Sequence, residues 1–345
     1  MKSIKSYLSM IVCVLYSASL IGCMQDNVYG YIIPEKTKER DGVIVEHVIL
    51  HPKAGHCSED TIIRKGVLAR CKNAKATILV CHGFMCDRYD VGILRKVFKK
   101  SDFNVMTFDF RAHGEDREGQ YCTFGRDECL DVIAAAKFLR NHPELQNIPL
   151  IVYGFSMGAV SAIEAQALVF NLFDAMILDC PFESSEKVIQ SGLKELKCTL
   201  FGCEFDMPGK EFLQKYAFHP YVQALVKAIL KTVAQMDATL VNTNFCPLYP
   251  AESAKKITVP AFFIHCKNDQ KVPVEQVMNV YENTAGYKRL WLTNGRRHYD
   301  SFFYNPEKYI ENVRLFCEQV LNDEIADMDQ EDIIEDEEDD EHLFG

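Results

Sequence analysis

Several features that mark large classes of protein are missing from this sequence. None of its 14 cysteines stands in a C-x-x-C pair, and no group of cysteine and histidine residues has the spacing of metal ligands. We therefore predict no metal and no other cofactor. An excess of basic residues is also missing, since 38 Lys and Arg stand against 49 Asp and Glu. The composition thus gives no indication of a nucleic-acid partner.

A long apolar run is missing as well. The N-terminal run at residues 7–21 follows Lys2 and Lys5, and it is too short to be a confident membrane span. It ends in L-I-G-C, which resembles a bacterial lipobox, and the resemblance implies lipid attachment at Cys23. We therefore expect residues 1–23 to be a signal peptide and the product to be a membrane-anchored lipoprotein of the bacterial cell envelope. A plain secretory signal, giving a secreted or periplasmic protein, is the alternative, as is an uncleaved anchor.

The acidic excess lies at one end of the chain. Thirteen acidic residues and no Lys or Arg lie between residues 323 and 341, so the rest of the chain is close to neutral. We predict that residues 323–345 form a disordered, solvated tail. Recruitment of a basic or Ca²⁺-bearing partner is the alternative, although the carboxylates lack the spacing of a Ca²⁺ loop.

Export would permit disulfides, and Cys198 and Cys203 are the nearest candidates for a local pair. Sequence alone does not give the pairing. Three other cysteines, Cys81, Cys180 and Cys266, each lie in an apolar, strand-like run, where a buried free thiol behaves as a small hydrophobic side chain.

The body of the chain, residues 42–322, alternates strand-like and helix-like segments after a polar stretch at 24–41 that we predict to be a linker. Two β-branched segments, 42–50 and 61–69, predict a leading antiparallel pair. Continuous apolar runs predict buried parallel strands at 76–81, 104–108, 150–153, 175–178, 259–264 and 288–292. Helices are predicted at 90–100, 122–140, 159–170, 274–281 and 306–321, with Glu128, Asp131 and Lys137 on the solvated side of the second. This alternation predicts an α/β fold with a mostly parallel central sheet and helices on both faces.

One stretch combines a strand, the motif G-x-S-x-G and a helix, which is the context of a nucleophile elbow. The glycines of the motif are Gly154 and Gly158, and at a tight strand-to-helix turn a Cβ at either position would clash. The turn would lift Ser156 Oγ clear of the sheet. It would also place the N–H of Met157 at a helix N-terminus, where it can face a developing oxyanion.

Further motifs accompany this elbow. They are H-G-F at 82–84, D-x-R-x-H-G at 109–114, K-N-D-Q-K-V-P at 267–273 and a late histidine, His298. Together they resemble the α/β-hydrolase superfamily over residues 43–321, and within it the serine-aminopeptidase-like (S33-type) and monoacylglycerol-lipase-like group. The chain departs from that pattern at Phe155, where histidine is commoner, and over residues 183–254.

The resemblance implies roles for particular residues. In such a fold the order nucleophile, acid, base would be Ser156, Asp269, His298, with Asp179 as the reserve acid. The oxyanion would be held by the N–H groups of Phe84 and Met157. The motif residues Asp109, Arg111 and His113 would brace the loop near the site.

The regular alternation stops over residues 183–254. This segment has no clear strand, and it contains helix-like stretches at 185–197 and 221–236 together with several breakers. An insertion at this place predicts a helical lid over the active site. Its apolar side chains would either line a pocket for an acyl chain or pack the lid onto the core.

The resemblance implies a serine hydrolase that cleaves a carboxylic ester, small or lipid-like, through an acyl-enzyme. The same three residues could serve an amidase or aminopeptidase, a thioesterase or an acyltransferase. A non-catalytic binding protein that keeps the fold is the alternative from another class. We expect the protein to contact the membrane through its lipidated N-terminus. The sequence does not indicate an oligomeric state.

Overall fold

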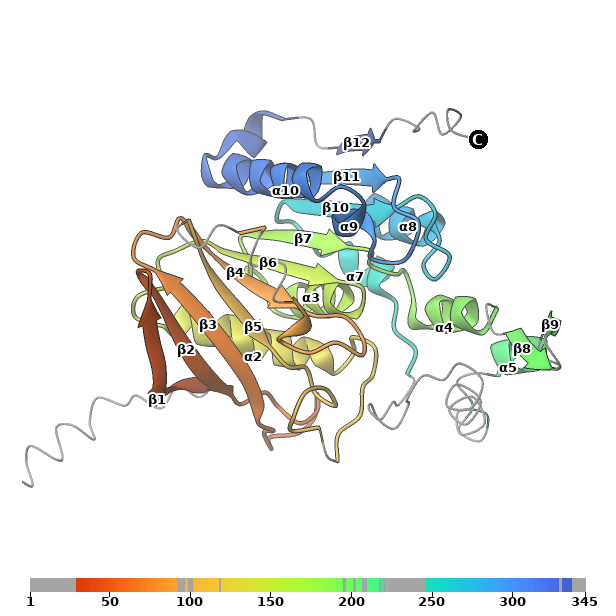
Figure 1. Cartoon of the computed structure of the whole chain (residues 1–345), viewed down its shortest axis with the longest axis horizontal. Helices are drawn as coiled ribbons and strands as arrows, with labels where there is room; N and C mark the ends of the chain where they lie inside the picture. Colours follow the sequence, from red (N-terminus) through yellow and green to blue (C-terminus); the bar gives the residue numbers. More distant parts are fainter. Residues whose placement is uncertain are drawn as a thin grey trace, which may run out of the picture.

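A ten-stranded sheet organises the computed structural model (Figure 1). The structure describes residues 29–91, 97–98, 102–117, 119–194, 197–200, 203–206, 210–216, 219, 222, 246–328 and 331–336. The expected signal peptide with Cys23, most of the helix expected at 90–100 and much of the expected lid lie outside these residues. Within them, no helix is both long and apolar enough to cross a bilayer.

The strands follow the spatial order β1-β2-β3-β5-β4-β6-β7-β10-β11-β12. Their bounds are β1 Gly30–Arg40, β2 Val43–Leu50, β3 Arg64–Cys71, β4 Ala76–Cys81, β5 Phe103–Phe108, β6 Leu150–Phe155, β7 Ala175–Asp179, β10 Ala261–Cys266, β11 Lys288–Thr293 and β12 Glu331–Glu335. The pairings from β1 to β5 are antiparallel, and those from β5 to β12 are parallel. Every residue of β4, β5, β6, β7, β10 and β11 is buried, as their apolar runs predict for strands covered on both faces.

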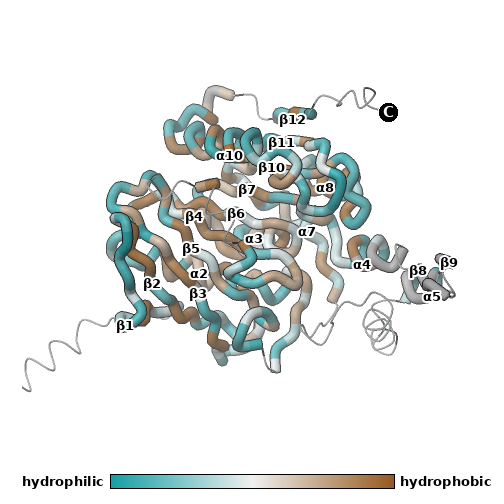
Figure 2. Tube along the Cα trace, viewed as in Figure 1, coloured by the Kyte–Doolittle hydropathy of each residue, from teal (hydrophilic) through white to brown (hydrophobic). Residues whose placement is uncertain are grey.

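Helices cover both faces of the sheet, and each layer has its own hydrophobic core. One layer holds α2 Glu128–Asn141, α3 Met157–Leu168, α7 Pro250–Ala254 and α8 Val274–Asn283. The other holds α9 Ser301–Tyr304 and α10 Pro306–Leu321. Apolar residues therefore concentrate along the central strands, while the outer helices carry many polar residues (Figure 2). The expected α/β architecture is present.

Two predictions about the first half of the chain are wrong. Residues 30–40 of the expected linker form β1, which pairs antiparallel with β2 over most of its length and so gains hydrogen bonds that a polar composition does not reveal. Glu128 and Asp131 are fully buried, although the pattern suggested a solvated side. Glu128 accepts hydrogen bonds from Thr123 and the N–H of Gly125, and Asp131 pairs with Arg111, so each carboxylate is satisfied inside the protein.

The predicted disordered tail is also wrong for the residues that are described. A short 3₁₀ helix, Glu324–Asp327, follows α10, and β12 then adds to the edge of the sheet beside β11. Ile334 packs against the second core, and Asp336 is 8% exposed. Acidic residues at this edge are held because basic side chains of the body face them.

The insertion after β7 contains more than helices. Its described elements are α4 Ser185–Lys194, β8 Lys197–Leu200, β9 Cys203–Asp206 and α5 Lys210–Lys215. Strands β8 and β9 pair antiparallel, so the expectation that this segment has no strand is wrong. In Figure 1 these elements lie to one side of the main sheet. The helical lid stays a prediction, and the side chains of Cys198 and Cys203 lie outside the description.

Candidate active site

The turn from β6 to α3 holds a serine in a strained conformation. Ser156 has φ 51° and ψ −121°, a region that residues with a side chain rarely adopt. A Cβ on Gly154 would lie 2.6 Å from the carbonyl oxygen of Gly158, and one on Gly158 would lie 2.2 Å from the carbonyl oxygen of Cys81. Both positions therefore require glycine. Ser156 is partly exposed, whereas the residues on either side of it are buried.

Three side chains from distant parts of the chain meet at this turn. His298 Nε2 lies 2.9 Å from Ser156 Oγ, and His298 Nδ1 lies 2.7 Å from Asp269 Oδ2. Asp269 follows β10, and His298 follows β11, at the same edge of the sheet as the turn after β6. Because parallel strands end at a common edge, residues far apart in sequence are brought together there.

Asp269 is held as an anion. Burial acts to raise its pKa, but the hydrogen bond with His298 and the N–H of Val272 outweigh burial, so the pKa lies below its ordinary value. Its second oxygen, Oδ1, accepts the N–H groups of Lys271 and Val272 at 2.9 and 3.0 Å. The carboxylate is thus fixed by backbone donors on one oxygen and offers the other to the imidazole.

The reserve acid, Asp179, is differently placed. Its Oδ2 accepts hydrogen bonds from Tyr309 at 2.8 Å and Tyr153 at 3.3 Å, in a fully buried site. Burial raises the pKa of this carboxyl to about 7. No hydrogen bond joins it to His298 among the described residues, so the histidine is paired with Asp269.

The two N–H groups expected to bind an oxyanion belong to Phe84 and Met157. The close approach of Gly158 to Cys81 and His82 brings the end of β4, and hence the loop with Phe84, against the serine turn. Neither Phe84 nor Met157 donates its N–H to another group in the described part of the chain. Met157 is the first residue of α3, where N–H groups have no intrahelical acceptor. This arrangement suits an anion beside Ser156.

The loop after β4 is braced by buried polar contacts. His82 bonds the carbonyl of Gly83 through Nδ1 and accepts the N–H of Phe110 through Nε2, and burial lowers its pKa to about 3. His113 Nε2 accepts the N–H of Met85 at 3.2 Å, and burial lowers its pKa to about 4. These histidines are neutral supports for the loop.

The motif carboxylate and guanidinium on the following loop are structural too. Asp109 pairs with buried Arg88 and accepts its N–H at 2.8 Å. Arg111 pairs with Asp131 at 2.8 Å and donates to two backbone carbonyls of the 51–60 loop. Buried charges paired in this way fix loops in place.

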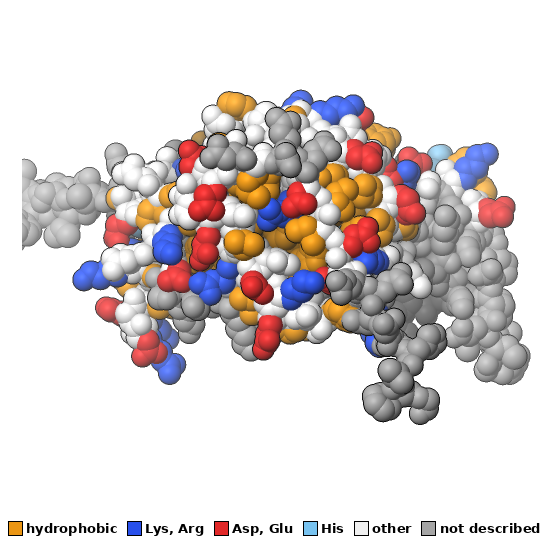
Figure 3. Space-filling model, turned by 90° about the horizontal axis from the view of Figure 1, so that it is seen from above, with side chains coloured by type: hydrophobic (Ala, Val, Ile, Leu, Met, Phe, Trp, Pro, Cys, Tyr) orange, Lys and Arg blue, Asp and Glu red, His pale blue; other side chains and the backbone are white. Residues whose placement is uncertain are grey.

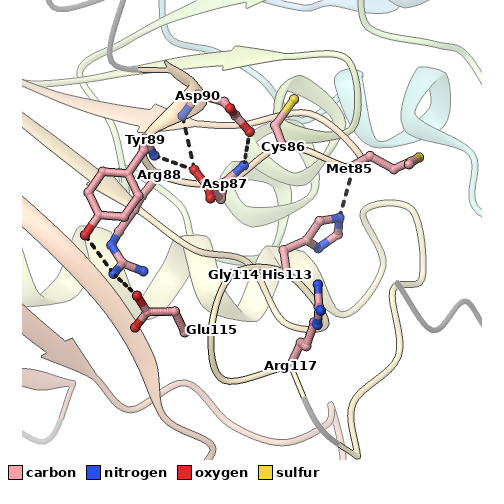
Figure 4. A pocket seen from close by; sticks show the side chains of 10 residues that line it. All are labelled: Met85, Cys86, Asp87, Arg88, Tyr89, Asp90, His113, Gly114, Glu115 and Arg117. Carbon is pink, nitrogen blue, oxygen red and sulfur yellow. Dashed lines mark hydrogen bonds and ion pairs between the residues drawn. The ribbon is translucent and has the colours of Figure 1, made fainter. Parts of the chain in front are cut away.

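A hollow of about 390 Å³ lies beside this loop, lined by residues between 85 and 90 and between 113 and 117 (Figure 4). Met85 and His113 face each other at one side of it, joined by the hydrogen bond already described. Its other lining residues are mostly charged, among them Arg88, Glu115 and Arg117. Its lining is polar and apolar in similar measure, and it includes Met85, the residue that follows Phe84.

Phe84 also has an apolar neighbour. Its ring lies 4.8 Å from that of Phe124, which packs against a small cluster formed by Val160, Phe182 and Val272. Val160 is one turn after Ser156, and Val272 is three residues after Asp269. This buried apolar cluster therefore joins the helix after Ser156, the loop after Asp269 and the start of the insertion.

Sequence reasoning missed two neighbours of the histidine. Cys180 Sγ lies 3.8 Å from His298 Nε2, and Cys180 itself has φ 45°. Tyr299 stacks on Phe155 with ring centroids 3.9 Å apart. The presence of phenylalanine instead of histidine at residue 155 was a sequence signal for the contact between Phe155 and Tyr299. Nothing in the sequence motifs indicated the contact between Cys180 and His298. Among the described residues, no group of three or more His, Cys, Asp or Glu could hold a metal ion.

Comparison with known proteins agrees with the fold. Residues 72–202 match the family model described as serine aminopeptidase, S33. The uncharacterized protein YqkD of Bacillus subtilis is 27% identical over 250 residues, covering 72% of each chain.

Solved structures are similar over most of the chain. The Pyrococcus furiosus esterase Pf2001 is 22% identical with a TM-score of 0.57, covering 79% of this chain and 92% of its own. The peroxisomal α/β-hydrolase Lpx1 of Saccharomyces cerevisiae is 14% identical with a TM-score of 0.55, covering 82% and 91%. The sheet order, the serine turn and these similarities together show that the chain has the α/β-hydrolase fold.

Proposed function

We propose that the protein is a serine hydrolase that cleaves carboxylic esters. The observation that carries this proposal is the continuous hydrogen-bonded series from Ser156 through His298 to Asp269. A serine hydroxyl is a weak nucleophile at neutral pH, and an imidazole within hydrogen-bond reach can remove its proton during attack.

The reaction follows from the positions of these groups. Ser156 Oγ attacks the ester carbonyl while His298 Nε2 takes the proton. Asp269 holds the imidazole tautomer with Nδ1 protonated and stabilises the imidazolium. The N–H groups of Phe84 and Met157 bind the tetrahedral oxyanion, each contributing about 3 kcal/mol. His298 returns the proton to the leaving alcohol, and water then hydrolyses the acyl-enzyme by the same route.

The partly exposed rings of Phe84 and Phe124, which lie 4.8 Å apart, support an ester with an apolar acyl group. The Pyrococcus furiosus neighbour is named an esterase, and another neighbour, with a TM-score of 0.53, is named an acetyl xylan esterase from Thermoanaerobacterium. Both names favour esters over amides, whereas the matched family is described as an aminopeptidase.

A fluorophosphonate probe tests the proposal directly. It should label the wild-type protein at Ser156 and leave Ser156→Ala unlabelled. A panel of nitrophenyl esters and aminoacyl amides should then show turnover of the esters. If well-folded protein were not labelled, the proposal would be wrong and the chain would be a binding protein with this fold. If only amides were turned over, it would be an amidase or aminopeptidase.

We also propose that the chain is exported and lipidated at Cys23. The support is the L-I-G-C sequence after the short apolar run. In a bacterial host, the wild-type protein should sediment with membranes, and Cys23→Ala should move it to the soluble fraction. An unchanged membrane fraction would contradict lipid attachment at this residue.

A further inference from the structure

Asp336, the residue directly after β12, contacts both of the loops that carry the acid and the base. Lys267, two residues before Asp269, donates from Nζ to the carbonyl oxygen of Asp336 at 2.7 Å. Asn294, four residues before His298, donates its N–H to Asp336 Oδ2 at 3.4 Å. This one residue, directly after β12, thus contacts the bases of two loops that meet at the serine.

The side chain of Asp336 is fixed by further contacts. Its Oδ1 accepts the indole N–H of Trp291 at 3.0 Å and lies 2.5 Å from Lys308 Nζ. Trp291 is fully buried in β11, so its N–H would have no acceptor among the described residues if Asp336 were absent. An unpaired buried donor is unfavourable, and this favours the docked strand.

Charge complementarity holds the rest of the strand. Arg289 on β11 pairs with Asp332 at 3.1 Å, and Lys267 pairs with Glu335 at 3.2 Å. The face that includes α10 and the last strands carries acidic and basic side chains interspersed, with apolar ones between them (Figure 3). The acidic composition of this segment therefore matches the basic residues that the body presents at this edge.

The two loops are also bonded to each other. The N–H of Lys267 donates to the carbonyl of Thr293 at 2.8 Å, and Thr293 Oγ1 lies 2.9 Å from Ser301 Oγ, which in turn lies 3.1 Å from Cys266 Sγ. A displacement at either loop base is transmitted to the other through these bonds.

We propose that Asp336 is a positioning residue for the hydrolytic reaction. It holds the loop of Asp269 and the loop of His298 at the separation that the hydrogen-bonded series requires. This inference rests on the proposed function. A serine, an imidazole and a carboxylate must be aligned within a fraction of an ångström for proton transfer, so loosening of either loop lowers the rate of the chemical step.

Asp336→Ala tests the proposal in the full-length chain. We expect kcat per active site, titrated with the fluorophosphonate, to fall about tenfold while KM changes less than about twofold. The rate of labelling at Ser156 should fall by a similar factor. The matched control is Ile333→Thr on the same strand, because Ile333 is exposed and the substitution keeps a β-branched side chain. The control should retain the wild-type kcat.

A second variant keeps the test decisive if Asp336→Ala folds poorly. Lys267→Met removes the bonds to Asp336 and Glu335 and keeps a long side chain, and it should lower kcat about threefold at unchanged KM. Assays are run well below the melting temperature of each variant. If both variants kept the wild-type kcat per titrated site, Asp336 would be only a structural contact. If the wild type itself neither hydrolysed esters nor reacted with the probe, the proposed function would be contradicted, and the role of Asp336 would be contradicted with it.

Discussion

His298 Nε2 lies 2.9 Å from Ser156 Oγ although 142 residues separate them. The contact exists because β6 and β11 end at one edge of a parallel sheet, so the turn after the first and the loop after the second face each other. The proposed chemistry depends on this contact, and the first two predictions test it.

Removal of the hydroxyl should abolish turnover. We expect Ser156→Ala to lower kcat by about 10⁴-fold or more while the melting temperature changes little, because the residual rate comes only from binding and the oxyanion donors. Steady-state kinetics on a nitrophenyl ester measure this. Ser161→Ala is the control, since Ser161 lies on the helix that follows Ser156 and its hydroxyl donates to the carbonyl of Met157. Equal kcat for the two variants would refute the role of Ser156.

The two buried aspartates should behave differently in the assay. Asp269→Asn leaves the imidazole without its carboxylate and permits the wrong tautomer, so kcat should fall by about 10³–10⁴-fold. Asp179→Asn should keep kcat within about threefold of the wild type, because Asp179 bonds two tyrosines and not His298. Parallel kinetics on both variants decide which carboxylate is the acid, and the opposite order would assign it to Asp179.

The stability of the protein should depend on pH through Asp179. Its pKa is about 7 in the folded protein against 3.8 ordinarily, because burial disfavours the anion. Between about pH 4 and pH 7 the unfolded chain is ionised at this residue while the folded chain keeps the proton, so stability falls as pH rises through this range. The loss is at most about 4 kcal/mol.

Asp179→Asn should remove this dependence. Urea unfolding at pH 4.5, 5.5, 6.5 and 7.5 should show the variant gaining stability relative to the wild type at each step. The exposed Asp60 supplies the control as Asp60→Asn, which should follow the wild-type curve. If the Asp179→Asn and wild-type curves ran parallel, the neutral carboxyl would be contradicted.

Gly158 should not tolerate a side chain. The added Cβ of Gly158→Ala would lie 2.2 Å from a backbone oxygen of β4, so the strand and helix must separate, at a cost of about 2–4 kcal/mol. The melting temperature should fall sharply, and the activity should fall with it. Gly55→Ala is the control, because nothing lies within 4 Å of its new Cβ. A Gly158→Ala protein with wild-type melting would show that the turn can relax.

Much of the fold could be predicted because its signals are local. The central strands are continuous apolar runs, and the order of Ser156, Asp269 and His298 follows from which strand each residue succeeds. The errors at residues 30–40, at Glu128 and Asp131 and in the acidic tail concern polar residues held by partners outside their own segment, whereas β8 and β9 were missed although they pair with each other. β12 is acidic, and Arg289, Lys267 and Lys308 hold it only once the sheet has formed. Glu128 and Asp131 are buried for the same reason, since Thr123 and Arg111 satisfy them.

The aromatic contact beside the histidine constrains how this protein can vary. The ring of Phe155 stacks on Tyr299 and leaves only 2.4 Å to a Cβ at residue 83. In an evolving lineage, a smaller residue at 155 would make room for a side chain at residue 83. It would also remove the stacking partner of Tyr299. Substitutions at these three positions are therefore expected to arise together among descendants of this gene, as a linked set rather than as independent changes.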